Sequence, residues 1–324
     1  MKTLVTGAGG FIGSHLTEWL LEKNHEVRAL VRYSSEGGWG KLREIPERLR
    51  PRLEVRLGDV RDPYMMRDLV EGCDCVFHLA SLIGIPYSYH APASYVATNV
   101  GGALNLLEAC RAARVRRLII TSTSEVYGTG RYIPMDESHP LQAQSPYAAS
   151  KIAADKLAES YFCSFDVPVV ILRPFNTYGP RQSARAVIPT IFAQVFSGAK
   201  EIFLGNLSPE RDLTYVEDTA RAFLAAAEIP GIEGKTVHFG QGESVSIGEL
   251  GRLCLEVAQT DAKVKITKDR ERPQKSEVDR LVCDAANARR LLGWTPQVAL
   301  KDGLRRTADY VRDHLEFYRH GYVV

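Results

Sequence analysis

The first residues of the chain place three evenly spaced glycines directly after an apolar stretch. Residues 2–6 read KTLVT, which predicts a buried strand, and the following glycines have the spacing G-x-x-G-x-x-G. Glycine at such a turn lets the backbone approach a phosphate, and the last glycine lets a helix pack closely on the strand. The positive end of that helix favours an anion. The sequence therefore predicts a dinucleotide-binding turn, formed by Gly7, Gly10, Phe11, Ile12 and Gly13.

The end of the second predicted strand bears on the identity of the dinucleotide. An acidic residue about 20 positions after the glycines would bind the ribose hydroxyls of NAD. This chain has Val31 there, followed by Arg32, Tyr33, Ser34 and Ser35. A guanidinium flanked by hydroxyls suits a 2′-phosphate, so we favour NADP as the cofactor. NAD stays open, because Arg32 could instead be a solvated loop residue.

Apolar runs alternate with helical periodicity through the first half of the chain. Further strands are predicted at 53–57, 75–79, 117–121 and 167–172, with helices at about 93–113 and 146–164. This alternation implies right-handed crossovers and a doubly wound parallel sheet of the Rossmann type. The residues expected to complete the cofactor site around these strand ends are Asp59, Val60, Leu79, Ala80, Ser81, Asn99 and Thr121.

The pattern changes in the second half of the 324-residue chain, where helices are separated by short strands. We expect 1–175 to form the dinucleotide-binding domain. Residues 176–324 are expected to form mainly a smaller α/β lobe for the substrate, with some later segments returning to the first domain. The length suits one large α/β unit or two coupled lobes.

The stretch from Thr121 to Lys151 contains the side chains most suited to catalysis. It reads TSTSEVYG and later SPYAASK. Tyr147 and Lys151 are four residues apart, so in a helix they share one face. An ammonium beside a phenol favours the phenolate and lowers the pKa of the phenol, which would make Tyr147 a usable base. Thr123, Ser124 and Glu125 follow a predicted strand, where open α/β sheets build their sites.

Loops of the second lobe contain two arginines and a carboxylate of interest. Arg211 and Arg272 could clamp a diphosphate, and Glu277 could accept hydrogen bonds from sugar hydroxyls. Each arginine could equally form only a surface salt bridge.

Composition excludes several other functions. A net charge of +2, with 45% hydrophobic and 25% charged residues, is typical of a globular protein that binds neither nucleic acid nor a membrane. We expect no membrane span and no cleavable leader. The six cysteines are scattered, and Cys73 and Cys75 lack partner ligands for zinc, so no metal site is predicted. We expect a cytoplasmic protein with reduced thiols.

Taken together, the motifs TGAGGFIG, TSTSEVYG, YAASK and RPFNTYGPR resemble the extended short-chain dehydrogenase/reductase superfamily of nucleotide-sugar enzymes. The resemblance covers essentially the whole chain, since RDLTYVEDTA and LLGWTP also fit. Thr123, Ser124 and Glu125 are similar to the triplet of the 4,6-dehydratases, in the serine version of GDP-mannose 4,6-dehydratases. IPYSY, FNTYGPRQSARA and LSPERDL resemble, more closely still, retaining nucleotide-diphospho-N-acetylglucosamine 4,6-dehydratases of legionaminic acid pathways.

This resemblance implies a reaction in which a sugar is oxidised at C4, loses water across C5 and C6, and receives the hydride back at C6. Tyr147 with Lys151 would remove the 4-hydroxyl proton, Thr123 would orient the 4-oxygen, and Glu125 would take the C5 proton. Ser124 or protonated Glu125 would protonate the leaving hydroxyl. The cofactor would be tightly held and regenerated. The implied substrate contacts for UDP- or GDP-N-acetylglucosamine are Thr123, Asn176, Arg181, Ile188, Leu204, Asn206, Arg211, Arg272 and Glu277.

Alternatives of other kinds stay open. A nucleotide-uronic-acid decarboxylase or a 4-epimerase would share the C4 oxidation, and a regulatory protein could keep the fold without the chemistry. The resemblance also implies a homodimer, formed by a four-helix bundle from the helices at about 93–113 and 146–164. The alanines of the second helix could instead face the protein's own sheet.

Overall fold

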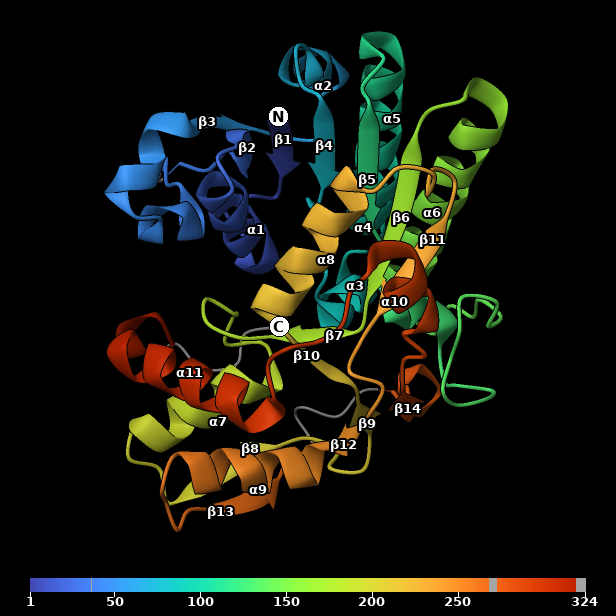
Figure 1. The fold of residues 1–324 in the computed structure, drawn as a ribbon. Helices are drawn as coiled ribbons and strands as arrows, with labels where there is room; N and C mark the ends of the chain where they lie inside the picture. Colours follow the sequence, from blue (N-terminus) through green and yellow to red (C-terminus); the bar gives the residue numbers. More distant parts are fainter. Residues whose placement is uncertain (36, 268–272, 319–324) are drawn as a thin grey trace.

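The computed structural model describes residues 1–35, 37–267 and 273–318. A seven-stranded parallel sheet forms the centre of the larger lobe (Figure 1), with strand order β11-β6-β5-β4-β1-β2-β3. This confirms the predicted α/β doubly wound fold. The strands are β1 (Lys2–Thr6), β2 (Glu26–Arg32), β3 (Leu53–Gly58), β4 (Cys75–His78), β5 (Arg117–Thr121), β6 (Val169–Pro174) and β11 (Thr236–Phe239).

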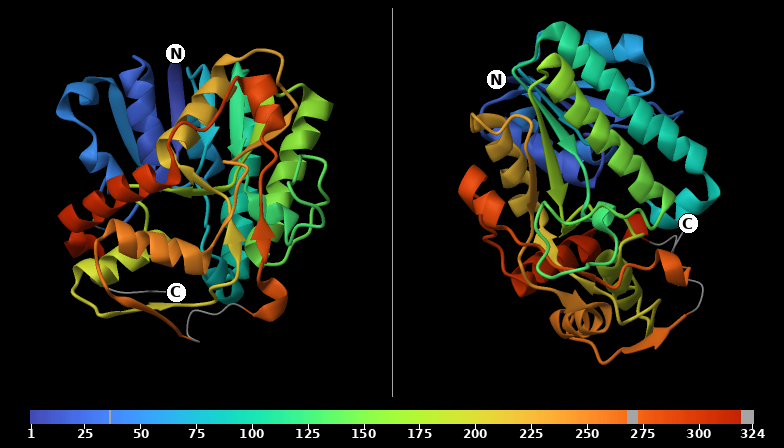
Figure 2. Two further views of the ribbon diagram at one scale, coloured as in Figure 1. Left: turned by 60° about the horizontal axis from the view of Figure 1, so that its bottom comes forward. Right: turned by 90° about the vertical axis from the view of Figure 1, so that its right-hand side faces the viewer.

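Helices cover both faces of this sheet. Successive side chains of each strand point to opposite faces, and the strands carry apolar side chains on both, so each face needs a layer of helices. Val5 and Phe77 belong to one hydrophobic cluster, whereas their neighbours Leu4 and Val76 belong to another. The first cluster includes residues of α1 (Phe11–Glu22), α8 (Val216–Glu228) and α10 (Ala286–Leu292). The second includes residues of α2 (Pro63–Val70), α5 (Gly102–Ala113) and α6 (Pro146–Phe165), and Figure 2 shows the two helical layers.

The long helix predicted at 93–113 has an irregular centre. It consists of α4 (Pro92–Tyr95), a π-helical turn η3 (Val96–Gly101) and α5, and a short helix α3 (Ile85–His90) precedes it. A π turn inserts one residue into the helical repeat and occurs often at functional sites. Here the π turn contains Asn99, which donates a hydrogen bond to Ser150 of the helix α6.

Helix α6 begins where the sequence supplies a strong start signal. The Ser145 side chain caps the helix by accepting from the Ala148 amide over 3.1 Å, and Pro146 occupies the first turn. The helix ends at Asp166, which adopts a left-handed conformation. This start places Tyr147 in the first turn, close to the carboxyl end of β5.

The smaller lobe packs below the sheet (Figure 1) around its own hydrophobic cluster. Phe11 and Ile12, in the first turn of α1, pack against this cluster, so the glycine turn lies at the boundary of the two lobes. No helix among the described residues is long and apolar enough to cross a membrane. The elements of the smaller lobe are β7 (Asn176–Tyr178), α7 (Val187–Phe196), β8 (Glu201–Leu204), β9 (Glu210–Arg211), β10 (Leu213–Tyr215), β12 (Val245–Ser246), α9 (Ile247–Val257), β13 (Lys263–Ile266), η6 (Gln274–Ser276), β14 (Arg280–Leu281), α11 (Leu300–Asp313) and η7 (Leu315–Tyr318).

Candidate active site

The glycine turn between β1 and α1 has the shape of a phosphate cradle. Gly7 has a positive φ of 71°, and a Cβ atom there would lie 2.7 Å from the Ala80 amide nitrogen. A Cβ atom at Gly13 would lie 2.2 Å from the Gly7 carbonyl oxygen. Gly10 begins α1 with no side-chain cap, which leaves the first amide groups of the helix available to an anion. The turn therefore fits the pyrophosphate of a dinucleotide.

The carboxyl ends of β2 and β3 form the neighbouring part of this edge. Exposed side chains at this edge are Arg32, Ser34 and Ser35, which are therefore accessible to a ribose phosphate. At the end of β3, both carboxylate oxygens of Asp59 accept hydrogen bonds from the Arg61 guanidinium, which lowers the pKa of Asp59. The buried Val60 follows Asp59.

The loop after β4 contains Leu79, Ala80 and Ser81, and Asn99 fastens it to α6. Asn99 Oδ1 accepts from Ser81 Oγ over 3.1 Å and from the Leu82 amide over 2.8 Å. Asn99 Nδ2 donates to the Leu82 carbonyl over 3.0 Å and to Ser150 Oγ over 2.9 Å. These four bonds fill the capacity of an amide side chain. Asn99, predicted as a cofactor contact, thus has a positioning role in this structure.

Tyr147 and Lys151 lie on one face of α6, as their spacing predicts. Tyr147 is buried with Ile85 and Tyr95, and the Tyr95 ring meets it edge-on with centroids 6.2 Å apart. Lys151 Nζ donates to the Thr121 carbonyl and, over 3.4 Å, to Ser81 Oγ. The ammonium therefore lies between the ends of β4 and β5.

The predicted lowering of the pKa of Tyr147 is wrong for the protein alone. Burial raises the pKa of the Tyr147 phenol, and a hydrogen bond with Thr123 opposes that rise only in part. Burial also lowers the pKa of Lys151 to about 8, against a smaller raising effect of Asp155. The spacing of the two residues does not show how deeply they are buried, and desolvation has the largest effect on both pKa values when both groups are buried. A positively charged nicotinamide ring, when bound nearby, would favour the phenolate.

Thr123, Ser124 and Glu125 form the short turn η4 (Ser124–Tyr127) and its cap. Thr123 Oγ1 accepts from the Glu125 amide over 3.2 Å, and Ser124 is buried. The Glu125 carboxylate lies close enough to Tyr147 to raise the pKa of that phenol. The structure thus brings together Thr123, Glu125 and Tyr147, as the sequence predicted.

Three predicted ligand contacts present buried polar atoms that have no hydrogen-bond partner among the described residues. These atoms are Thr121 Oγ1, at the end of β5, Asn176 Oδ1, just after β6, and Arg181 Nη1, in the loop after β7. Buried polar atoms are usually satisfied, so a bound molecule is a natural partner for each of them. Thr121 is predicted to contact the cofactor, and Asn176 and Arg181 are predicted to contact the substrate, so the free atoms fit those roles.

The structure brings Arg211 and Glu277 together. Arg211 Nη2 lies 3.4 Å from Glu277 Oε1, and both side chains are largely buried. The pair joins β9 to the segment after η6. The arginine predicted to bind the diphosphate and the carboxylate predicted to bind sugar hydroxyls are therefore neighbours in the second lobe. Arg272 lies outside the described residues.

Other predicted substrate contacts lie elsewhere in the second lobe. Ile188 and Leu204 belong to its hydrophobic core, with 1% and 2% of their surface exposed. Asn206 is exposed, and its Oδ1 accepts from Ser208. Arg181 is buried against Glu18 and Glu44 of the first lobe. The protein itself thus provides Arg181 with two carboxylate partners.

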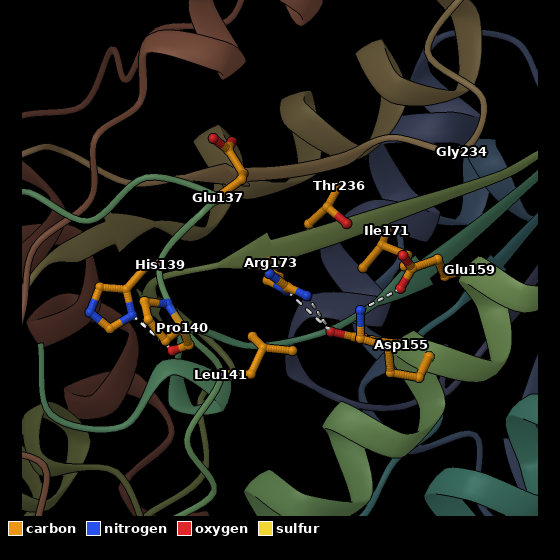
Figure 3. Close-up of a pocket in the computed structure, with 11 residues that line it drawn as sticks. Glu137, His139, Pro140, Leu141, Asp155, Glu159, Ile171, Arg173, Gly234 and Thr236 are labelled. Carbon is orange, nitrogen blue, oxygen red and sulfur yellow. Dashed lines mark hydrogen bonds and ion pairs between the residues drawn. The ribbon is translucent and has the colours of Figure 1, made fainter. Parts of the chain in front are cut away.

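Sequence reasoning missed a buried polar network behind α6. Asp155 Oδ2 accepts from Ser122 Oγ over 2.7 Å and from Arg173, while Arg173 Nη1 donates to Tyr127 Oη over 3.0 Å. Figure 3 shows the Arg173–Asp155 pair in a cavity of about 370 Å³. None of the predicted catalytic residues lines this cavity. The position of Asp155, one helical turn after Lys151, was the available signal.

No group of His, Cys, Asp and Glu side chains suited to a metal ion occurs in the part of the chain that the structure describes.

Comparisons with known proteins agree with this arrangement. Residues 4–307 match the model of a family described as GDP-mannose 4,6 dehydratase. The chain is 33% identical over 320 residues to an uncharacterized UDP-glucose epimerase, YtcB, of Bacillus subtilis (strain 168), and the match covers 96% of this chain and 98% of that protein.

Two solved structures with NAD bound are also similar. The dTDP-glucose 4,6-dehydratase DesIV of Streptomyces venezuelae is 30% identical with a TM-score of 0.89, and the match covers 98% of this chain and 99% of that one. A mutant UDP-glucuronic acid 4-epimerase of Bacillus cereus is 29% identical with a TM-score of 0.89, covering 97% and 100%. These complexes give the predicted preference for NADP no support. The lengths matched and the identities show that the chain belongs to the extended short-chain dehydrogenase/reductase family of nucleotide-sugar epimerases and dehydratases.

Proposed function

We propose that the protein is a nucleotide-diphospho-sugar 4,6-dehydratase that forms a 4-keto-6-deoxy sugar, with UDP- or GDP-N-acetylglucosamine as the preferred substrate class. The observation that carries this proposal is the Glu125 carboxylate, which shares one short turn with Thr123 and lies close to Tyr147. A carboxylate at this place gives the site a second base besides the phenol. Elimination of water needs that second base.

The bound dinucleotide supplies the chemistry of hydride acceptance from C4 and hydride return to C6. Tyr147 removes the proton of the 4-hydroxyl, and the charge of Lys151 supports the phenolate. Thr123, which hydrogen-bonds with Tyr147, orients the 4-oxygen. The ketone at C4 acidifies the C5 hydrogen, which Glu125 takes as a general base. Ser124, or the newly protonated Glu125, protonates the 6-hydroxyl as it leaves as water. The proton that Tyr147 took from the 4-hydroxyl balances the reaction, because C5 must regain one proton from the acids of the site when hydride returns to C6.

Epimerases are the main alternative, because both the sequence and the structure resemble them as well. A 4-epimerase needs the C4 oxidation but has no step for a base at C5. The resemblance indicates that epimerases usually carry small hydroxyl residues or alanine at the positions of Ser124 and Glu125. A decarboxylase of nucleotide-uronic acids is a further alternative, distinguished by release of carbon dioxide.

The test is a panel of UDP-, GDP-, CDP- and dTDP-linked hexoses and hexuronic acids, with product analysis by mass spectrometry and NMR. We expect a 4-keto-6-deoxy product from the wild type, and arrest at or before the 4-keto hexose in Glu125→Gln. Glu159→Gln removes an exposed carboxylate from α6 and should turn over normally. A 6-deoxy product from Glu125→Gln at the wild-type rate, or a C4 epimer from the wild type, would contradict the assignment.

We further propose that the protein accepts NADP as well as NAD. Val31 occupies the place of an acidic ribose ligand, and the exposed Arg32 follows it at the end of β2. The NAD in the related complexes argues for NAD in this chain too. Competition between the two dinucleotides, repeated with Arg32→Ala, tests the proposal. We expect the variant to lose affinity for NADP and to keep affinity for NAD.

A homodimer through a four-helix bundle of the segments 92–113 and 146–165 is also proposed. Val96 and Leu104 are exposed on the first segment, with 58% and 39% of their surface accessible, which supports an apolar contact surface. Ala148, Ala154 and Ala158 are buried within the subunit, so they take no part. Sedimentation at micromolar concentration tests the dimer, and Val96→Glu with Leu104→Glu should shift it to the monomer.

A further inference from the structure

The segment after β2 returns to the glycine turn and rests on it. The Lys41 amide donates to the Gly9 carbonyl over 3.0 Å. Gly40 has a positive φ of 58°, and a Cβ atom there would lie 2.5 Å from the same Gly9 oxygen. A Cβ atom at Gly9 would lie 3.1 Å from the Trp39 carbonyl oxygen. Residues 39–41 therefore cover the turn that fits the dinucleotide phosphates, at van der Waals distance.

The short helix η1 (Gly40–Glu44) holds this cover in place through Glu44. Glu44 accepts from Tyr310 Oη over 2.9 and 3.0 Å and from Arg181 Nε over 3.1 Å. Lys41 Nζ lies 3.3 Å from Glu44 Oε1 and donates to Tyr310 Oη over 3.2 Å. Burial raises the pKa of Glu44, but its hydrogen bond with Tyr310 and the two cations outweigh that effect and lower it overall. The carboxylate is thus charged at neutral pH.

The partners of Glu44 come from the second lobe. Tyr310 belongs to α11, and Arg181 follows β7 in the loop that enters this lobe. Arg181 also binds Glu18 of α1 over 2.7 Å, and the preceding Pro180 carbonyl contacts His15 Nε2 over 3.0 Å. One arginine therefore connects α1, which follows the glycine turn, to η1, which rests on that glycine turn.

We propose that Glu44, held by Arg181 and Tyr310, is a cofactor-retention clamp: it fastens residues 39–41 over the glycine turn and sets how slowly the dinucleotide leaves. Departure of the dinucleotide requires residues 39–41 to lift from Gly9. Lifting them separates Glu44 from both second-lobe partners and exposes charged groups that are now paired. The proposed clamp requires that the protein binds a dinucleotide, and it does not depend on which reaction the bound dinucleotide serves.

The test measures dissociation of the dinucleotide and needs no sugar substrate. The protein is loaded with NADH, whose fluorescence reports the bound form, and is chased with excess NAD in a stopped-flow instrument; NADPH and NADP are used in a parallel series. We expect Glu44→Gln and Arg181→Gln to release NADH about tenfold faster, since each loses charged hydrogen bonds. Tyr310→Phe should release it about threefold faster.

Glu217→Gln is the matched control. Glu217 pairs with Arg306 over 3.1 Å and also joins a helix of the first lobe, α8, to α11, but its ion pair does not involve η1. Its release rate should stay within about twofold of the wild type. Wild-type release from Glu44→Gln, or equal acceleration in Glu217→Gln, would overturn the clamp. If Arg181→Gln fails to fold, the partly exposed Glu44 and Tyr310 still decide the question. Failure of the proposed dehydration leaves these rates unaffected, so the two outcomes can be told apart.

Discussion

Arg173 donates two hydrogen bonds to a single oxygen of Asp155, from Nε over 3.1 Å and from Nη2 over 3.0 Å. Both side chains are almost fully buried, and the second oxygen of Asp155 has no hydrogen-bond partner in the part of the chain that the structure describes. The cavity beside the pair is polar and large enough for water, which is the natural partner for that oxygen (Figure 3). The pair joins β6 to α6, and Asp155 lies one helical turn after Lys151.

Removal of one partner of this buried pair should destabilise the protein strongly. In Arg173→Gln the Asp155 carboxylate loses its buried ion-pair partner, and we expect the free energy of unfolding to fall by about 3 to 5 kcal/mol. Denaturant titration measures it. Glu159→Gln, which breaks the exposed ion pair with Lys156 beside the same cavity, should change stability by less than about 1 kcal/mol. Equal effects of the two substitutions would refute the argument.

Lys151 should affect stability and activity in opposite directions above neutral pH. Burial lowers its pKa from 10.5 to about 8 in the folded protein. Below pH 8 the lysine is charged in both states, so its burial cost is constant. Between pH 8 and 10.5 the folded protein has lost the proton and the unfolded chain still binds it, so stability rises with pH. Asp155 is the charged group that opposes this shift.

The comparison of wild type with Lys151→Met isolates this contribution. The stability difference between them should move in favour of the wild type as pH rises from 8 to 10.5, in thermal or denaturant unfolding. Over the same interval the initial oxidation of the sugar, followed by absorbance of the reduced nicotinamide, should slow in the wild type, because the phenolate loses its neighbouring cation. A pH-independent stability difference would show that Lys151 titrates normally.

Asn99 should be sensitive to replacement by its acid. In Asn99→Asp the donor group becomes an acceptor, so the Leu82 carbonyl and Ser150 Oγ each lose a donor. We expect a stability loss of about 1 to 3 kcal/mol and slower oxidation of the sugar with unchanged dinucleotide affinity, because the residue positions α6. Asn105→Asp is the comparison, because Asn105 is half-buried on α5 and its side chain donates to the Val60 carbonyl. A selective loss of dinucleotide affinity in Asn99→Asp would favour the original cofactor prediction.

Local sequence patterns were sufficient for most of the sheet. The strands β1 and β5 have the predicted bounds, and β3, β4 and β6 differ from theirs by one or two residues, since buried parallel strands appear as continuous apolar runs. The seventh strand, β11, was not predicted. It is only four residues long and joins the sheet from far along the chain, so its partner β6 could not be inferred from neighbouring sequence.

The candidate site was predictable where spacing alone determines proximity. Tyr147 and Lys151 share a helix face, and Thr123 with Glu125 follows a strand end, so both pairs could be placed without coordinates. Arg181 could not, because its motif gives no sign that Glu18 and Glu44 face it across the lobe boundary. The pKa of Tyr147 was equally out of reach, because desolvation depends on how closely the whole structure packs around the ring.

The last prediction concerns the contact between Gly13 and Gly7. In Gly13→Ala the new methyl group would lie 2.2 Å from the Gly7 carbonyl oxygen, which is backbone and has little freedom to move. Helix α1 must therefore shift away from β1, and its free amide groups shift with it. We expect about 1 to 3 kcal/mol of lost stability and at least about tenfold weaker binding of NADH, measured by melting and by fluorescence titration.

Gly101→Ala is the control for this experiment. Gly101 also lies in a helical segment, but the nearest atom to its added methyl group is 4.0 Å away. Alanine there should leave NADH binding unchanged and, if anything, stabilise the helix by up to about 1 kcal/mol. Normal NADH affinity in Gly13→Ala would mean that α1 can adjust without moving its amide groups. The helix would then not owe its phosphate-binding position to close packing at Gly13.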